Sequence, residues 1–472
     1  MSVKNNRRAA LKMIGSAAAG LVIGGLAGYY MKGPEIIEKT FTTTVKETVT
    51  TLVTSPVATA ATTTLPGIRV REPREPAPPG ESPFKGLPLE FPGIGSVSDI
   101  VPKAKYYLAL SNCSLEADWR ILFEKWFVDW MSEFGKRFGT KFTHVNAYGD
   151  AAKQLRDVEA LIATHPDILI MTALEAAPLD PVADLAEKEK VPLFMIDREI
   201  VRPPKSNPYY LAHFAWDDVF NGVQNGFMIA EYLRETYGEP IGHVVEITGL
   251  MGATPAKYRA SGLRFTLENF PDIRIIDCRD GKWETKAAYE IMRDWLELYP
   301  KNYINVLNAH NDPEGMGAKE AMKERGREEI AITSHDGYVE ALKATLNWEE
   351  TKWLGVAEFG PAFAIPAISY AIKYLNGEFD FPQPYYEVKA RYFTGRDPTM
   401  KRWLEENIPK AETEKAIFLP LEWGGLKESE GISARKEALK VYQIPYYEKD
   451  SPVRKIFENP YATQKPLEKW PA

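Results

Sequence analysis

Charged and polar side chains recur where the apolar segments of this chain end. They gather in five short stretches, which are Ser111–Arg120, Ile196–Arg198, Gly252–Arg259, Ala309–Asp312 and Ser334–Asp336. In chains that alternate strands and helices, ligands bind at the carboxyl ends of the strands. Carboxylates accept hydrogen bonds and guanidinium groups donate two parallel ones, so together they suit neighbouring hydroxyl groups. The five stretches therefore predict a cleft for a small polyhydroxylated molecule.

The elements that would position these stretches follow a regular order from Lys105 onward. Strands are predicted at Tyr106–Leu110, Phe142–Asn146, Ile168–Met171, Leu193–Ile196, Leu211–Phe214, His243–Ile247, Ile273–Cys278, Val306–Ala309, Ile330–Ser334 and Trp353–Ala357. Helices are predicted at Trp119–Phe138, Ala151–Thr164, Pro181–Lys190, Phe220–Thr236, Ala256–Phe270, Thr285–Leu298, Glu314–Arg325 and Phe363–Leu375. Such alternation gives parallel sheets with helices on both faces. We expect an α/β fold of two doubly wound parallel-sheet lobes, joined by a hinge and separated by a ligand cleft.

The order and spacing of these stretches resemble one family over about residues 103–397. The chain is similar to type I periplasmic binding proteins of the ribose and galactofuranose group, the solute receptors of sugar ABC importers. The resemblance rests on five sequence segments, which are Leu110–Arg120, Ile196–Glu199, Val244–Gly262, Ala309–Asp312 and Asp336-Gly337. The resemblance implies that the lobes close on a monosaccharide, a pentose or hexose for which a furanose form is an option. It also implies delivery to the permease subunits of the importer, with no chemistry, no cofactor and no metal.

The resemblance assigns hydroxyl-binding roles to residues on both sides of the cleft. Asp197 and Arg198 would act from the first lobe, and Arg259, Asn311 and Asp336 from the second. Each residue also has a structural interpretation. Asp197 and Arg198 could form an exposed ion pair of little energy. Asn311 could cap the following helix, Asp336 could make a local turn, and Arg259 could be an exposed helix residue.

Further candidates are weaker matches to the family. Glu116, Trp119 and Arg120 lie in the first strand–helix loop, where an indole would give a flat wall for a sugar ring. Trp119 could instead be a buried helix anchor, a common role for tryptophan. Trp283 matches an aromatic position near the family's cleft. Glu358 stands at a predicted crossover strand, where the family often has a polar contact.

The first hundred residues predict a targeting segment followed by a stalk. Arg7 and Arg8 precede an apolar run at 13–31, which resembles a twin-arginine (Tat) export signal. The run is also close to the ~20 residues that span a bilayer as a helix, so residues 1–31 are either an export signal or a membrane anchor. Residues 32–102, rich in Thr and Pro, predict a stalk. Both alternatives place the folded part outside the cytoplasm, secreted or anchored at the cell surface.

The remaining boundaries follow from the predicted strand order. We assign 103–216 and 359–384 to the N-terminal lobe, and 217–358 and 385–397 to the C-terminal lobe. Residues 398–472 form an extension beyond the family's usual length. Its aromatic stretches would either pack back on a lobe or meet the permease.

Composition and missing motifs narrow the function classes. A net charge of −7 gives no electrostatic footprint for nucleic acid. The two cysteines, Cys113 and Cys278, fall in different predicted lobes and predict no disulfide. The histidines lack metal-ligand spacing, and no hydrolase elbow, phosphate loop or dinucleotide fingerprint occurs. A sugar-sensing receptor ectodomain for signalling or chemotaxis is the main alternative. A glycosidase, which needs two cleft carboxylates, is disfavoured.

Overall fold

A computed structural model describes residues 74–468, apart from 88–89, 92, 362, 389, 414–415 and 419–444. The predicted export signal or anchor at 1–31, and the first part of the predicted stalk, lie outside the described residues. Within the described part of the chain, no helix combines the length and the apolar character needed to cross a membrane.

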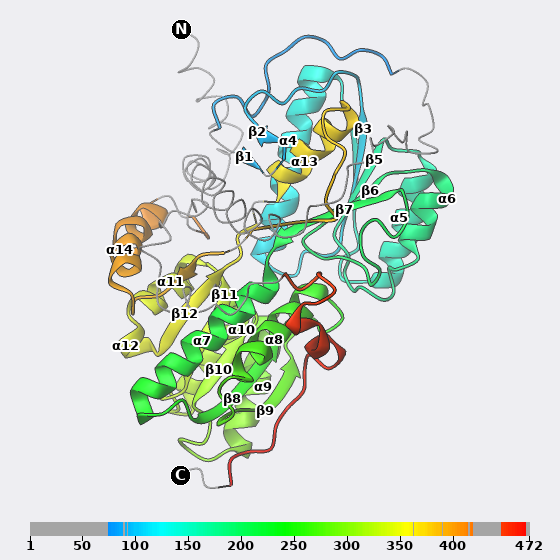
Figure 1. Ribbon diagram of the computed structural model, residues 1–472. Coiled ribbons are helices and arrows are strands. Elements are labelled where there is room, and N and C mark those ends of the chain that lie inside the picture. Colours follow the sequence, from blue (N-terminus) through cyan, green and yellow to red (C-terminus); the bar gives the residue numbers. More distant parts are fainter. Residues whose placement is uncertain are drawn as a thin grey trace, which may run out of the picture.

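The N-terminal lobe is built on a six-stranded parallel sheet in the order β13-β7-β6-β5-β3-β4 (Figure 1). Its strands are β3 (Tyr107–Asn112), β4 (Lys141–Asn146), β5 (Ile168–Met171), β6 (Leu193–Ile196), β7 (Tyr210–Trp216) and β13 (Tyr385–Val388). Its helices are α4 (Asp118–Phe138), α5 (Ala151–Ala163), α6 (Val182–Glu189) and α13 (Ala364–Leu375). Helix α4 packs with α13, and α5 packs with α6.

The C-terminal lobe is built on a second six-stranded sheet, in the order β14-β12-β11-β10-β8-β9. Only its edge strand β14 is antiparallel to its neighbour. Its strands are β8 (Gly242–Thr248), β9 (Ile273–Asp280), β10 (Val306–Ala309), β11 (Ala331–Asp336), β12 (Trp353–Glu358) and β14 (Tyr392–Phe393). Its helices are α7 (Asp218–Tyr237), α8 (Thr254–Leu267), α9 (Thr285–Leu298), α10 (Asp312–Glu324), α11 (Val339–Leu346) and α12 (Trp348–Thr351).

The central strands are buried because helices cover both faces of each sheet. Every residue of β5, β6 and β10 is buried. The two-lobed α/β fold predicted from the sequence is confirmed.

The chain passes between the lobes three times, after β7, after β12 and after β13. The last passage corrects a predicted boundary. Tyr385–Val388 pairs with β7 in the N-terminal lobe, whereas the sequence assigned 385–397 to the C-terminal lobe. Only β14, which pairs with β12, belongs there. Three short connections of this kind allow the lobes to rotate as rigid bodies.

The predicted stalk ends earlier than residue 102. Phe84 is fully buried, with ring centroids 4.9 Å from Trp130 and 5.2 Å from Phe134 on α4. Phe91, in the short hairpin of β1 (Glu90–Phe91) and β2 (Gly95–Ser96), packs 6.1 Å from Phe214. Residues 74–102 therefore complete the N-terminal core where they are described. Isolated aromatics between prolines and glycines carry no periodic pattern that would have revealed this.

The C-terminal extension packs on the C-terminal lobe. Helix α14 (Pro398–Thr413) contacts α11, and the 3₁₀ helix η2 (Pro452–Glu458) contacts α8. In Figure 1, α14 and the red segment that contains η2 lie on different sides of this lobe.

Candidate ligand-binding cleft

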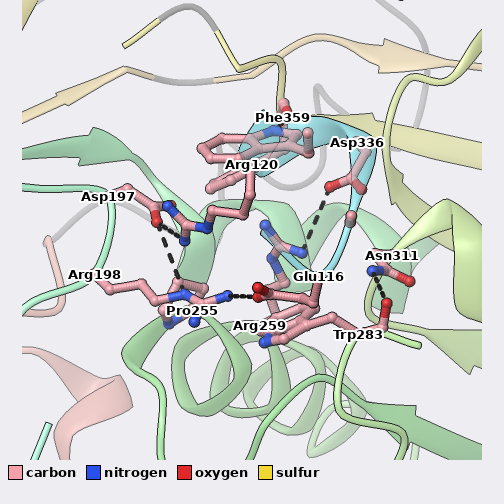
Figure 2. Close-up of a pocket in the computed structure, with 12 residues that line it drawn as sticks. Glu116, Arg120, Asp197, Arg198, Pro255, Arg259, Trp283, Asn311, Asp336 and Phe359 are labelled. Carbon is pink, nitrogen blue, oxygen red and sulfur yellow. Dashed lines mark hydrogen bonds and ion pairs between the residues drawn. The ribbon is translucent and has the colours of Figure 1, made fainter. Parts of the chain in front are cut away.

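A cavity opens between the lobes, with an empty volume of about 380 Å³ that includes some open solvent. Figure 2 shows charged side chains converging on it from both lobes. The residues that line it are Glu116, Ala117, Trp119, Arg120, Asp197, Arg198, Pro255, Arg259, Trp283, Asn311, Asp336 and Phe359. Nine of the ten residues singled out in the sequence are among them.

The N-terminal lobe contributes a network of ion pairs to the cavity wall. Arg120, at the start of α4, pairs with Asp197, which directly follows β6. The next residue, Arg198, donates from Nη2 to Oε1 of Glu116 at 3.2 Å. All of these groups except Glu116 are nearly inaccessible to solvent. They are buried parts of one network, so the exposed ion pair considered for Asp197 and Arg198 is not what the structure shows.

Two polar atoms of this network have no hydrogen-bond partner in the described structure. They are Oδ1 of Asp197, an acceptor, and Nε of Arg198, a donor. A buried polar atom without a partner costs roughly 1–3 kcal/mol. An acceptor and a donor on adjacent residues match a hydroxyl group, which both donates and accepts.

Arg259 enters the cavity from α8 of the C-terminal lobe. Its Nε donates to Oδ1 of Asp218 at 2.8 Å, and its Nη1 donates to the carbonyl oxygen of His310. Nη1 also lies 4.0 Å from Oδ1 of Asp336. Arg259 is 2% exposed, so it is not an exposed helix residue.

Close packing of α7 against α8 brings Arg259 to Asp218. A Cβ at Gly222 on α7 would lie 2.1 Å from the carbonyl oxygen of Arg259. A Cβ at Gly262 on α8 would lie 2.0 Å from the carbonyl oxygen of Val219. Only glycine permits this reciprocal approach of two helix backbones.

Aromatic rings complete the walls. Trp119 stacks on Phe359 with centroids 5.6 Å apart and donates from Nε1 to the Phe359 carbonyl at 2.7 Å. The guanidinium carbon of Arg259 lies 4.2 Å above the Phe359 ring. Trp119 is thus both a buried anchor of α4 and a wall of the cavity. Trp283 contributes a second indole, whose Nε1 has no partner among the described groups.

Three residues of the cavity have left-handed backbone conformations. The φ angles are 63° at Asp197, 68° at Trp283 and 110° at Asp336. Positive φ is uncommon outside glycine and is strained for a bulky residue such as Trp. Such conformations cluster at functional sites, where surrounding structure holds them.

Asn311 holds the Trp283 turn in place while capping a helix. Its Oδ1 accepts from the backbone N–H of Glu314 at 2.7 Å, which caps α10. Its Nδ2 donates to the Trp283 carbonyl at 3.2 Å. The capping role considered for Asn311 is therefore real, and the residue lines the cavity as well.

Three carboxyl groups in and behind the cavity have raised pKa values. Burial raises the pKa of Asp218 to about 7, although Arg259 opposes the shift. Burial likewise raises the pKa of Asp312 to about 7, and that of Asp336 well above its ordinary value. Asp312 accepts from the backbone N–H groups of Gly337 and Tyr338, each at 2.8 Å. Asp312 thus fixes the turn after β11 that presents Asp336.

The two lobes touch each other beside the cavity. The N–H of Ala176 donates to the Gly252 carbonyl at 2.9 Å, and the N–H of Glu199 donates to Oγ1 of Thr254 at 3.1 Å. The Tyr258 hydroxyl donates to Oε1 of Glu199 at 2.5 Å. These contacts, which we call the seam, show a closed arrangement of the lobes.

Glu358 is the one predicted ligand residue that does not line the cavity. Its two carboxylate oxygens accept from Nε and Nη2 of Arg391, each at 3.1 Å. It therefore secures the crossover between the lobes, a correction to its predicted role. The sequence missed its neighbour Phe359, which does line the cavity, together with Ala117 and Pro255. Apolar residues at a strand end give no chemical signal of a site.

Comparisons with known proteins support one family. The sequence profile of the periplasmic binding protein domain matches residues 108–360. The galactofuranose-binding protein YtfQ of Escherichia coli (strain K12) is 30% identical over 227 residues, which is 47% of this chain and 68% of that protein. The ribose import binding protein RbsB of Bacillus subtilis (strain 168) is 25% identical over 256 residues, 54% of this chain and 77% of that protein.

Solved structures agree with the fold. The fructose binding periplasmic domain of the hybrid two component system BT1754 superposes with a TM-score of 0.56 at 25% identity, covering 66% of this chain and 97% of that one. A galactofuranose binding protein gives a TM-score of 0.55 at 25% identity, covering 64% and 98%. With its two parallel-sheet lobes and the profile match across more than half its length, the chain belongs to the type I periplasmic binding protein family.

Proposed function

We propose that this chain is an extracytoplasmic receptor that captures a monosaccharide by hinge closure and delivers it to the permease of an ABC importer. The observation that carries the proposal is the convergence of carboxyl and guanidinium groups from both lobes on one cavity. Asp197 and Arg198 face it from one side, and Arg259 and Asp336 from the other. Closure would let such groups replace the water around a sugar's hydroxyls.

The walls of the cavity suit one sugar ring. The indoles of Trp119 and Trp283 offer flat apolar surfaces for the C–H face of a ring. A pentose or hexose, furanose forms included, is the ligand we propose. The names of the relatives YtfQ and RbsB, which bind galactofuranose and ribose, support this class.

We propose binding without chemical conversion, because the cleft carboxylates are engaged by arginines and the named relatives are binding proteins. Incubation with aryl glycosides tests the glycosidase alternative, and release of the aryl group would contradict our proposal.

We further propose that residues 1–31 export the chain or anchor it in the membrane. Arg7, Arg8 and the apolar run after them support this proposal.

A sensory receptor is the second candidate. One structural neighbour is the periplasmic domain of a two component system, so the same fold serves signalling as well as import. Pull-down of the full chain with sugar present distinguishes the two functions. Permease subunits among the bound proteins support import, and a histidine kinase or chemoreceptor supports sensing.

The test of binding is a thermal-shift screen over pentoses and hexoses. A sugar at 100 times its dissociation constant should stabilise the fold by about 2.7 kcal/mol. Arg198→Ala and Asp336→Ala should abolish that shift, because each removes a polar group proposed to bind the sugar's hydroxyls and leaves a buried partner in its own lobe unpaired. Arg202→Ala is the matched control, since this half-buried arginine pairs with Asp180 away from the cavity. A normal shift in both cavity variants would remove these residues from the binding site.

A further inference from the structure

Residues 445–467 of the extension, which we call the strap, are fixed to the C-terminal lobe. Gln464 pairs with the edge strand β9 through two hydrogen bonds to Ile275, of 2.7 and 3.0 Å. Nε of Arg264 donates to the Ala462 carbonyl at 3.0 Å, and the Tyr461 hydroxyl donates to the Met251 carbonyl at 2.9 Å. The strap therefore moves with this lobe whenever the lobes rotate.

The other end of the strap contacts the N-terminal lobe. Tyr447 stacks on Tyr385 of β13, with centroids 4.6 Å apart and an interplanar angle of 14°. Tyr446 meets the same ring edge-on at 6.0 Å and is 3% exposed. In Figure 1 the red segment reaches the level at which the two lobes meet. Opening the lobes must therefore pull these tyrosines away from β13.

The strap also closes over the seam. Glu199 of the N-terminal lobe is fully buried and is hydrogen-bonded by Tyr258 and by Tyr446. Tyr258 in turn packs against Tyr446 at 4.4 Å and stacks on Phe457 at 5.1 Å. Burial raises the pKa of Glu199. One carboxyl group of one lobe is thus held by the other lobe and by the strap together.

We propose that the strap is a latch that favours the closed arrangement of the lobes. It adds contacts to the N-terminal lobe that are lost when the lobes separate. A protein whose binding-competent state is more populated has a higher apparent affinity. The latch would thus slow release of any bound molecule without touching it.

The prediction is tested by hydrogen exchange on the full chain, with no added sugar. The N–H groups of Ala176 and Glu199 donate across the seam, so their exchange reports opening. Tyr447→Ala and Tyr385→Ala should each speed exchange in peptides that contain these amides by about two- to tenfold, the range expected for loss of a stacked aromatic pair. Peptides from the central strand β10 should exchange as in the wild type.

A double variant, Tyr385→Ala with Tyr447→Ala, tests whether the two tyrosines act through their mutual contact or each weaken the fold independently. If Tyr385 and Tyr447 act through each other, the double variant should exchange at nearly the rate of either single variant. Tyr299→Ala is the matched control, because it removes a half-buried tyrosine stacked on Tyr303 within the C-terminal lobe. It should leave the seam peptides unchanged. Wild-type exchange at the seam in both single variants, or effects that multiply in the double variant, would overturn the latch. Because no sugar is added, this result stands apart from the binding test above.

Discussion

Glu246 on β8 is the centre of a polar cluster buried beneath the cleft. Its carboxylate accepts from Nη1 of Arg264 at 2.7 Å and from Nε2 of His310 at 2.9 Å. The same arginine holds the strap through Ala462, and the His310 carbonyl accepts from Arg259 in the cavity. This one carboxylate thus supports residues of both the strap and the ligand cavity.

The charge on Glu246 should make stability depend on pH in acid. Burial raises its pKa, but Arg264 and His310 outweigh burial and lower it from 4.5 to about 2. A lowered folded-state pKa gives stability that is complete above pH 4.5 and is lost as the pH falls towards 2, roughly 3 kcal/mol in all. Glu246→Gln should cost about this much at pH 7 and less at pH 3, as measured by urea unfolding. Glu297→Gln, on the exposed surface, should show no such change, and an equal loss at both pH values would contradict the assignment.

Gly249 sets the position of the Trp283 indole. A Cβ there would lie 2.1 Å from Cε2 of that ring. Gly249→Ala should displace the indole from the cavity wall and weaken sugar binding about tenfold, since overpacking costs roughly 1–3 kcal/mol. Isothermal titration with the sugar that gives the largest thermal shift measures the change. Gly135→Ala on α4, whose nearest contact would be the Thr140 carbonyl at 3.1 Å, should bind normally. Unaltered affinity in Gly249→Ala would show that the indole does not contact the sugar.

Most of the cavity could be predicted from the sequence because its residues are charged and follow apolar strands. Asp197, Asn311 and Asp336 all stand at such positions. Glu358 stands at one too, yet its partner Arg391 comes from a later crossing of the chain. A sequence pattern shows where a strand ends, but it does not show which distant residue will neutralise the charge there.

At the scale of elements, the segment before β3 acts as part of the N-terminal lobe. Phe84→Ala should lower the free energy of unfolding by about 3–5 kcal/mol, the usual cost of removing a buried phenylalanine. Urea denaturation measures the loss, and Tyr148→Ala, which is 69% exposed, serves as the control with a change within about 0.5 kcal/mol. An unchanged midpoint for Phe84→Ala would mean that the segment is not docked.

Strands buried on both faces were predictable as continuous apolar runs, and β5, β6 and β10 begin and end where the sequence indicated. The elements that the sequence did not predict depend on contacts with distant parts of the chain. Strand β13 alternates between half-buried residues, Tyr385 and Glu387, and buried residues, Tyr386 and Val388. It becomes a strand by pairing with β7. Helix α14 carries Pro409 within it, a residue that normally argues against a helix interior.

At the scale of the whole molecule, two similar sheets, three crossings and a seam suit the proposed receptor, in which the lobes would rotate about their connections. The sequence indicated the two lobes because strand–helix alternation occurs twice. It did not indicate that the extension joins them, because aromatic residues such as Tyr446 and Tyr447 carry no periodic pattern. Their partners, Tyr385 and Tyr258, lie in different lobes.

The late position of β13 in the chain has a consequence for biogenesis. The N-terminal sheet lacks its edge strand until the ribosome has made almost all of the other lobe, so this sheet cannot be completed on the nascent chain domain by domain. Pairings between residues so distant in sequence form slowly. Unpaired strand edges of an unfinished sheet also attract other chains. The unfinished N-terminal sheet should therefore need shelter from other chains until residue 388 has emerged.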